Sequence, residues 1–319
     1  MRRDIASVLV MALILASSQV AAIAISPVFK ATGLQAFPQP ENPTNALVYI
    51  VMILVFTALI LGLVRYRRRD FAKYVILASI FLTLAFVLLL PIFFGLVFLN
   101  PEVFATEFGG NLATLFAFLV AGLLVYTLVK YPEWYVVDAI GIVTAVGVTA
   151  IMGISFAILP AILLLAGLAV YDAWAVYRTK HMVALADELT SQRLPVLLVI
   201  PKHANYSFRK QKSLREQVEK GEEREAMFIG LGDLIIPGVM SVSAFTWLDS
   251  TGPGLGGVPP NVLVAVATIV GSVIGFTILM RFVMRGNPQA GLPLLNGGAV
   301  AAFLVAYALM YGNLRFGIA

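Results

Sequence analysis

Residues 227–236 read Met227-Phe228-Ile229-Gly230-Leu231-Gly232-Asp233-Leu234-Ile235-Ile236, a stretch that is apolar except for one carboxylate after two glycines. The apolar run continues through Phe245, so it predicts a membrane-spanning helix over 227–247. An aspartate inside such a helix is costly to bury and by default marks a functional site with a partner. A second carboxylate, Asp172, stands in another apolar run. We predict that Asp172 and Asp233 meet inside the bilayer.

The composition indicates an integral membrane protein. Of the 319 residues, 60% are apolar and 12% are charged, whereas about a quarter are charged in soluble domains. The chain has no cysteine, which removes disulfides, thiolate metal sites and cysteine nucleophiles. The net charge of +5 is not a nucleic-acid signal in such a chain, and its distribution between the loops is the informative quantity.

Nine apolar runs are long enough to cross a bilayer as helices. They lie at residues 5–27, 46–64, 74–98, 112–129, 135–153, 157–177, 227–247, 261–283 and 291–313. The weakest boundary lies at 154–156, where the nearby Pro160 helps to break what would otherwise be one long helix. The sequence therefore predicts an all-α, polytopic membrane protein with nine transmembrane helices.

The basic residues predict the orientation of these helices. When successive loops are assigned to alternate sides, 20 of the 22 Lys and Arg residues fall on one side and two on the other. The positive-inside rule then places the N-terminus in the cytoplasm and the C-terminus outside. Miscounting one early helix would scramble this bias, so the asymmetry also supports nine spans.

A long sixth loop divides the chain into six helices and three. The predicted parts are a six-helix membrane part at 1–178, a cytoplasmic loop at 179–225 and a three-helix membrane part at 226–319. Within the loop, 194–200 is apolar and is typical of a short strand or a surface-lying segment. Residues 202–225 carry many charges of both signs, which is typical of a solvated, mobile linker.

Asp172 and Asp233 are predicted to lie at matching depths. Asp172 comes six residues before Arg178, where the sixth helix meets the cytoplasm, and Asp233 comes seven residues after Ala226, where the seventh helix leaves it. At 1.5 Å per residue, these spacings correspond to depths of about 9 and 10 Å. Two carboxylates at nearly the same depth on adjacent helices can face each other and share a proton.

Two further acidic residues border apolar runs and have a simpler interpretation. Asp138 stands near the start of the fifth helix, beside two aromatic residues, and we expect it at the membrane interface. Asp249 stands in the polar seventh loop, where we expect it to be solvated. Replacing Asp138 is therefore expected to do much less than replacing Asp172 or Asp233.

A carboxylate pair within the membrane has two chemical uses. Because two close carboxyl groups do not readily carry two charges, one stays protonated while the other is ionised. The ionised member can take a proton from water while the neutral one polarises a carbonyl, as in aspartic proteases. Gly230 and Gly232 would let another backbone approach. The alternative is that these glycines only allow close helix packing, and that both aspartates bind an ion or proton in a transporter or cation-leak channel.

Other intramembrane chemistries lack the side chains that they need. The histidines are His181 and His203, both in the sixth loop, and no H-E-x-x-H motif occurs, so the sequence has no zinc hydrolase site. No G-x-S-x-G motif is present, and no histidine lies in a predicted helix to activate a serine. No Walker-type phosphate loop occurs. Neither a metal nor another cofactor is expected.

Three motifs together resemble those of the presenilin and signal-peptide-peptidase family of GxGD-type intramembrane aspartyl proteases. The first is Tyr171-Asp172 in the sixth helix, and the second is Gly230-Leu231-Gly232-Asp233 in the seventh. The third is Leu292-Pro293-Leu294-Leu295, which is similar to the family's P-A-L at the start of the ninth helix, with Leu294 in place of the alanine. The resemblance covers nearly the whole chain and is most like a microbial, archaeal presenilin homologue.

The resemblance implies roles for individual residues. Asp172 and Asp233 would be the catalytic pair, and Leu231 would line the substrate path. The apolar segment before Lys202 and the residues just before Gly230 would pair with an unwound substrate by strand addition. The residues implied to shape the site are Tyr171, Gly230, Gly232, Pro293, Leu294 and Leu295.

The sequence thus predicts an aspartic endopeptidase that uses two acids and water to cut peptide bonds within transmembrane helices. The expected partners are single-pass membrane proteins or peptides and the lipid bilayer, without nucleic acid and, by analogy with microbial relatives, without partner subunits. Self-association into a homo-oligomer stays open. The transporter or cation-leak channel is the alternative, and a catalytically idle binding relative is a third hypothesis that the intact aspartate pair argues against.

Overall fold

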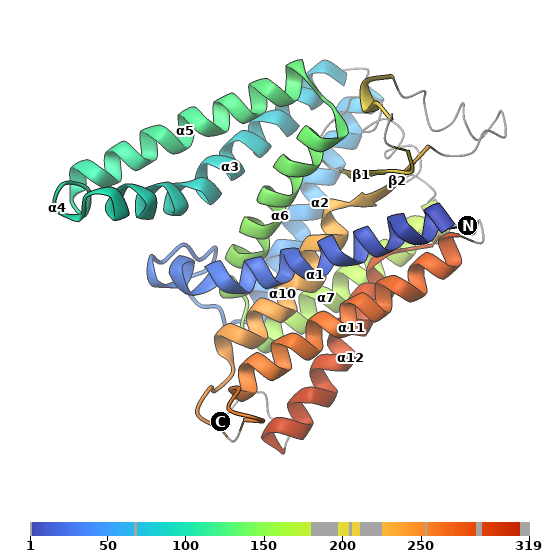
Figure 1. The fold of residues 1–319 in the computed structure, drawn as a ribbon. Helices are drawn as coiled ribbons and strands as arrows, with labels where there is room; N and C mark the ends of the chain where they lie inside the picture. The colour runs from blue at the N-terminus through green and yellow to red at the C-terminus, as the bar shows by residue number, and fades with distance from the viewer. Residues whose placement is uncertain are drawn as a thin grey trace. The chain divides into compact units, whose positions relative to one another are not determined.

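The computed structural model describes residues 2–66, 69–179, 197–203, 206–210, 225–252, 254–284 and 289–312. Its helices of membrane-spanning length and composition are α1 (Arg2–Ala31), α2 (Thr44–Arg65), α3 (Arg69–Leu99), α5 (Glu107–Lys130), α6 (Trp134–Ser155), α7 (Ile158–Trp174) with the π-helical turn that extends it to Arg178, α11 (Pro260–Val283) and α12 (Leu292–Tyr311). The shorter apolar helix α10 (Leu231–Trp247) brings the number to nine within the described residues (Figure 1). The predicted helical membrane fold is confirmed.

The predicted seventh helix is wrong at its start. Residues 226–230 form the strand β2 (Ala226–Gly230), and α10 begins only at Leu231. A short apolar run does not distinguish a buried strand from a helix by periodicity, and here the glycine marks the change between the two. Because a strand rises about 3.3 Å per residue, the depth of Asp233 that we derived from helical rise is also wrong.

A short strand, β1 (Leu197–Pro201), pairs with β2 in a two-stranded sheet. This agrees with the strand interpretation for 197–200, whereas 194–196 and 211–224 lie outside the described residues. The N–H group of Lys202, just after β1, donates to the carbonyl oxygen of Glu225, just before β2, at 2.9 Å. A bond between the end of one strand and the start of the next means that the two strands run antiparallel.

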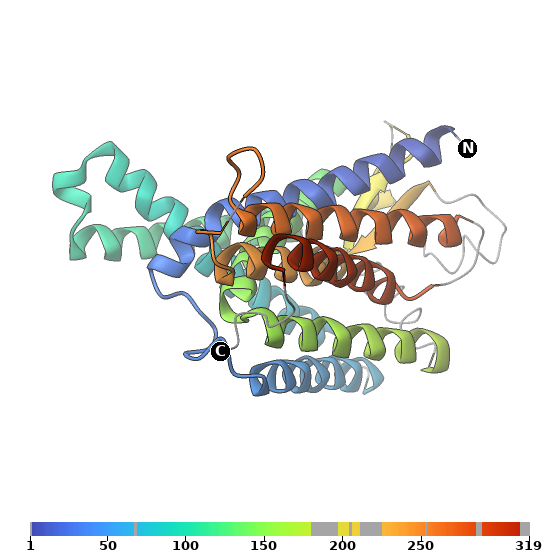
Figure 2. The same cartoon turned by 90° about the horizontal axis from the view of Figure 1, so that it is seen from below.

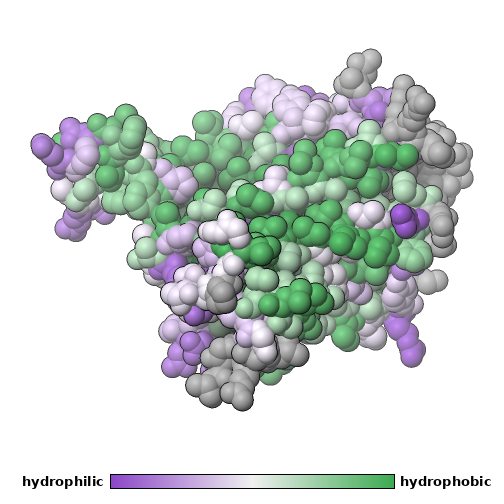
Figure 3. All heavy atoms as spheres, turned by 60° about the horizontal axis from the view of Figure 1, so that its bottom comes forward, coloured by the Kyte–Doolittle hydropathy of each residue, from purple (hydrophilic) through white to green (hydrophobic). Residues whose placement is uncertain are grey.

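The chain folds into two compact units, the first of which comprises residues 1–57, 149–186 and 229–319. In this unit α10 packs against α1, α7, α11 and α12 (Figures 1 and 2). All of its residues from 236 to 244 are buried. Outer helices of the unit expose large apolar side chains such as Leu13 and Val305, and the face drawn in Figure 3 is mostly apolar. This is the surface expected of helices that contact lipid.

Polar side chains hold α10 in place within the first unit. Ser241 donates to the side-chain oxygen of Gln19 at 2.7 Å, and Gln19 donates in turn to Ser272 at 2.9 Å. Towards the end of α10, Ser243 donates to the carbonyl oxygen of Phe156 at 2.8 Å. Buried polar groups without partners are costly in lipid, so these bonds favour one rotation and one height of α10.

The second unit comprises residues 58–148 and 187–228. In it α3 and α5 pack along each other and are joined through the short helix α4 (Pro101–Phe104). The side chain of Asn100 caps α4, and that of Thr106 caps α5. An apolar core joins α3, α5 and the first part of α6 to β1 and to the 3-10 turn η2 (Phe208–Lys210).

Candidate active site

Asp233 lies in the first turn of α10, directly after β2. Gly230 ends the strand with extended backbone angles (φ −65°, ψ 140°) and is the N-cap residue of the helix. The first turn of a helix has unpaired N–H groups and a partial positive charge, which favour a carboxylate there. The G-x-G-D sequence is therefore a strand-to-helix junction with its acid at the helix N-terminus. The side chain of this acid is partly buried.

The two glycines of this junction have different surroundings. A Cβ atom on Gly230 would lie 3.4 Å from Oδ2 of Asp233, so the acid packs against this glycine. A Cβ atom on Gly232 would meet no atom within 4 Å, and Gly232 is exposed. The described residues therefore leave open space beside Gly232, the residue that directly precedes Asp233.

Asp172 lies near the C-terminal end of α7 and is only 5% exposed. The helix continues into a π-helical turn at Ala175–Thr179, where the Ala175 N–H group donates to the carbonyl oxygens of both Tyr171 and Asp172. Such turns occur often at functional sites. The carboxylate oxygen Oδ2 of Asp172 accepts a hydrogen bond from the backbone N–H group of Leu292 at 3.0 Å.

Gly291 and Leu292, at the start of α12, contact both acids. The backbone of Gly291 donates a further hydrogen bond to the Asp172 carboxylate. Its Cα also lies against the second acid, because a Cβ atom there would be 2.9 Å from Oδ1 and 3.3 Å from Oδ2 of Asp233. The two carboxylates are close enough to interact electrostatically. One dipeptide therefore lies against both predicted site acids.

Close packing of α11 and α12 positions this dipeptide. A Cβ atom on Gly275 of α11 would overlap with the carbonyl oxygen of Leu294, and one on Gly271 would overlap with that of Gly298. Glycines four residues apart allow two helix backbones to touch within a membrane. The start of α12 is therefore fixed by backbone contact.

The remaining predicted site residues lie around this centre. Leu295 is fully buried, Leu231 is nearly so, and Tyr171, Pro293 and Leu294 are partly buried. A proline can interrupt hydrogen bonding in a helix, but Pro293 occupies the first turn of α12. N–H groups there have no intrahelical partner, so a proline in this position interrupts nothing.

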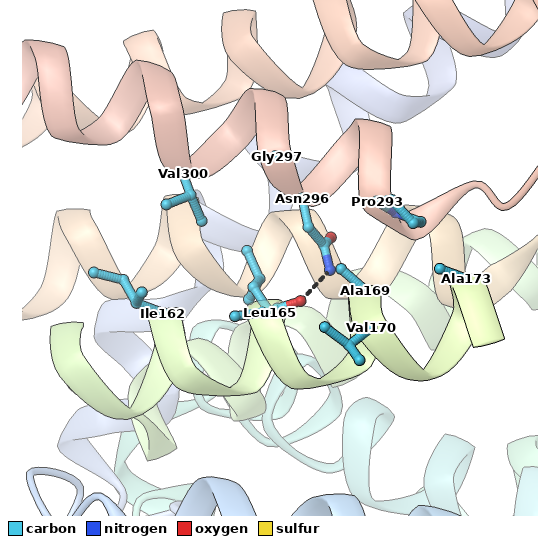
Figure 4. A pocket seen from close by; sticks show the side chains of 10 residues that line it. Ile162, Leu165, Ala169, Val170, Ala173, Pro293, Asn296, Gly297 and Val300 are labelled. Carbon is cyan, nitrogen blue, oxygen red and sulfur yellow. Dashed lines mark hydrogen bonds between the residues drawn. The ribbon is translucent and has the colours of Figure 1, made fainter.

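A groove with a volume of about 330 Å³ runs between α7 and α12 beside the Asp172 turn (Figure 4). Ala169 and Ala173 of α7 face Pro293 and Asn296 of α12 across it. The Asn296 amide donates to the carbonyl oxygen of Leu165 at 2.9 Å, while its buried Oδ1 has no partner within the described residues. The groove is otherwise apolar.

The other two acidic residues differ from each other. Asp249 is exposed, as expected, and accepts hydrogen bonds from the N–H and hydroxyl groups of Thr251 at 2.9 and 2.7 Å, which hold the pKa of Asp249 below its usual range. Asp138 is buried, and its carboxylate has a backbone partner. It is 7% exposed and accepts the N–H group of Val199 at 2.8 Å.

Sequence reasoning missed Gly291. The sequence feature that could have indicated this residue is a glycine directly before the Leu292-Pro293 motif, where any side chain would add bulk. Nothing in the sequence connects that glycine with Asp233. In the part of the chain that the structure describes, no three His, Cys, Asp or Glu side chains gather so that they could hold a metal ion.

Comparisons with known proteins place the chain beside one family. The family model of signal-peptide peptidase and presenilin aspartyl protease matches residues 11–312. A solved structure of a presenilin-family intramembrane aspartate protease in space group C222 is 33% identical with a TM-score of 0.64, and the match covers 95% of this chain and 99% of that one. A solved structure so described in space group P2 is 34% identical with a TM-score of 0.61, covering 94% and 96%. No curated protein matches the chain.

Proposed function

This chain belongs to the signal-peptide peptidase and presenilin family of aspartyl proteases, and from that premise we propose that Asp172 and Asp233 are its catalytic pair. The observation that carries the proposal is the contact of the Gly291-Leu292 backbone with both carboxylates. Two acids held against one short segment can act on the same peptide group. Acids that act as a pair are also the groups that aspartic proteases use.

The proposed reaction needs the two acids in different protonation states. The ionised carboxylate takes a proton from water while the water oxygen attacks the carbonyl carbon of the scissile bond. The neutral carboxyl group donates its proton to the carbonyl oxygen, which gives a tetrahedral gem-diol. Transfer of a proton to the amide nitrogen and cleavage of the C–N bond then release an amine and a carboxylic acid, and the pair returns to its starting state.

The two acids have different surroundings, which supports different roles for them in the reaction. Asp172 is buried and hydrogen-bonded to backbone N–H groups, whereas Asp233 is partly exposed and follows Gly232, beside which the described residues leave open space. Peptide hydrolysis in a membrane requires a route for water and a place for the substrate backbone. We infer that both use the open side of the strand-to-helix junction.

The sheet offers a place for an unwound substrate. Because Lys202 bonds to Glu225, residues 198, 200 and 202 turn their backbone groups towards β2, and 225, 227 and 229 turn theirs towards β1. The alternate residues of β2, Ala226 and Phe228, turn theirs to the outer edge. An extended peptide can add to that edge through main-chain hydrogen bonds. We propose that the substrate helix unwinds and binds there, just before α10 in the chain.

Cleavage of a transmembrane peptide by purified protein in detergent tests the assignment. Asp172→Ala and Asp233→Ala are each expected to abolish cleavage, and the double variant is expected to be no worse than either, because residues acting as a unit are not additive. Both variants should still fold by thermal unfolding, since each removes an acid that is costly to bury. Asp249→Ala, which removes an exposed acid, is the matched control and should retain activity.

Two outcomes would contradict the proposal. The first is substantial cleavage by either single variant. The second is a wild-type protein that never cleaves peptide but supports ion or proton flux in vesicles, with that flux lost in both variants, which would favour the transport alternative.

We further propose that the N-terminus is cytoplasmic and the C-terminus is outside, as the distribution of basic residues predicts. Substrates would then be single helices with their N-termini outside. Reporter fusions at the C-terminus and within 179–225 measure the orientation, and a C-terminal reporter found in the cytoplasm would overturn both statements.

A further inference from the structure

On the edge of β1 that faces away from β2, one backbone N–H group is bonded to a side chain. Val199, in the middle of the strand, turns its N–H group away from β2 and donates it to Oδ1 of Asp138 at 2.8 Å. Both groups are buried, since Val199 is 0% and Asp138 7% exposed. An edge strand normally presents such N–H groups to any strand that approaches. Because the Val199 N–H group is bonded to Asp138, it is not available to pair with another strand.

A second acid just before α6 anchors the same segment further along. Glu133 accepts the N–H group of Phe208 at 3.2 Å and the hydroxyl group of Ser207 at 2.9 Å. Asp138 and Glu133 therefore hold β1 and η2 on one helix end. These acids also lie near a buried phenol, because burial raises the pKa of Tyr206 above its usual range and Glu225, Glu133 and Asp138 raise it further.

We propose that Asp138 is a positioning residue for the substrate: by bonding to Val199 it fixes the register of β1 and leaves the outer edge of β2 as the edge on which substrate binds. The inference rests on the proposed function, because it concerns where the substrate strand lies. A side chain that occupies an edge N–H group both anchors the strand and excludes a competing partner. Asp138 thus acts on the choice of scissile bond without touching the reacting atoms.

Substitutions at Asp138 separate this role from a general contribution to folding. Asp138→Ala removes the acceptor for Val199, while Asp138→Asn keeps an oxygen acceptor of the same size. For Asp138→Ala we expect KM to rise at least threefold, with kcat changed less, and the single main product to spread over neighbouring cleavage positions in mass spectra. For Asp138→Asn we expect the wild-type product pattern, and for Asp249→Ala likewise.

Hydrogen exchange of residues 197–201 provides a second readout that needs no substrate. The Val199 amide should exchange slowly in the wild type and in Asp138→Asn, and faster in Asp138→Ala. If Asp138→Ala does not fold, Asp138→Ser takes its place, because its polar side chain is shorter and does not reach the amide. The same comparisons then apply.

The inference is overturned if Asp138→Ala keeps the wild-type products and KM, or if Asp138→Asn is as impaired as Asp138→Ala. Its failure is distinct from that of the proposed function. If Asp172→Ala loses cleavage while Asp138→Ala gives the wild-type products, the catalytic pair is supported and only the positioning role is rejected.

Discussion

Replacing Gly291 by alanine should separate catalysis from stability. A Cβ atom at this position would lie 2.9 Å from Oδ1 of Asp233, whereas ordinary contacts begin at 3.4 Å, so the carboxylate or the start of α12 must move by about 0.5 Å. A displacement of 1 Å in a catalytic group can cost about 100-fold in rate, so half of that corresponds to about tenfold. We expect kcat/KM to fall about tenfold, equivalent to about 1.4 kcal/mol.

The folded state should not suffer in the same way. Gly291 has φ −78° and ψ −51°, angles that alanine adopts without strain. Where backbone angles are compatible, Gly→Ala stabilises a protein by about 0.4–1 kcal/mol through the unfolded chain. Part of this stabilisation offsets the energetic cost of the close contact with Asp233, so the unfolding temperature is expected to stay the same or rise slightly.

The assay is cleavage of a transmembrane peptide, run beside thermal unfolding of the same samples. Gly110→Ala is the matched control, because a Cβ atom there would meet nothing within 4 Å. It should leave cleavage unchanged and raise the unfolding temperature slightly, because alanine restricts the unfolded chain at this helical position. Full activity in Gly291→Ala, or equal loss of activity and stability, would refute the reasoning that the dipeptide holds the two acids.

Three further predictions follow from the packing and the charges. Gly275→Ala should destabilise the protein by about 1–3 kcal/mol in thermal unfolding, since its Cβ would overlap with the backbone of Leu294; an unchanged unfolding temperature would contradict the close contact. Pro293→Ala should lower peptide cleavage more than it lowers stability, because this proline lines the groove beside the Asp172 turn; equal loss would indicate a folding role alone. The raised pKa of Tyr206 means that the folded state holds this proton more tightly than the unfolded state, so stability should be constant below pH 10 and fall as the pH rises above it. Tyr206→Phe should remove that decline, and an identical decline in both proteins would assign it to other groups.

The sequence was sufficient for the helices because lipid requires long apolar runs. Eight of the predicted spans agree with helices that begin and end within several residues of them. The remaining prediction, the seventh helix at 227–247, was wrong at its start because Met227, Phe228 and Ile229 suit a buried strand as well as a helix. The glycine motif that we placed inside a helix is in fact the transition from strand to helix.

The candidate site could be predicted in part. The two acids stood out because carboxylates are rare in apolar runs. Their neighbour Gly291 could not be found in this way, because its significance depends on a contact with Asp233, which is distant in sequence. The hydrogen bond of Asp138 could not be predicted for the same reason, because its partner Val199 lies in a different part of the chain.

The direct passage from β2 into α10 sets a fixed spacing within the chain. No loop separates Phe228 from Asp233, so the backbone between them has a length that is counted in whole residues. One residue added before Gly230 would displace a bound strand by about 3.3 Å and turn its side chains to the opposite faces. If substrate binds at β2 as proposed, this junction would fix the number of residues between the first paired residue of the substrate and its scissile bond, whatever the substrate sequence.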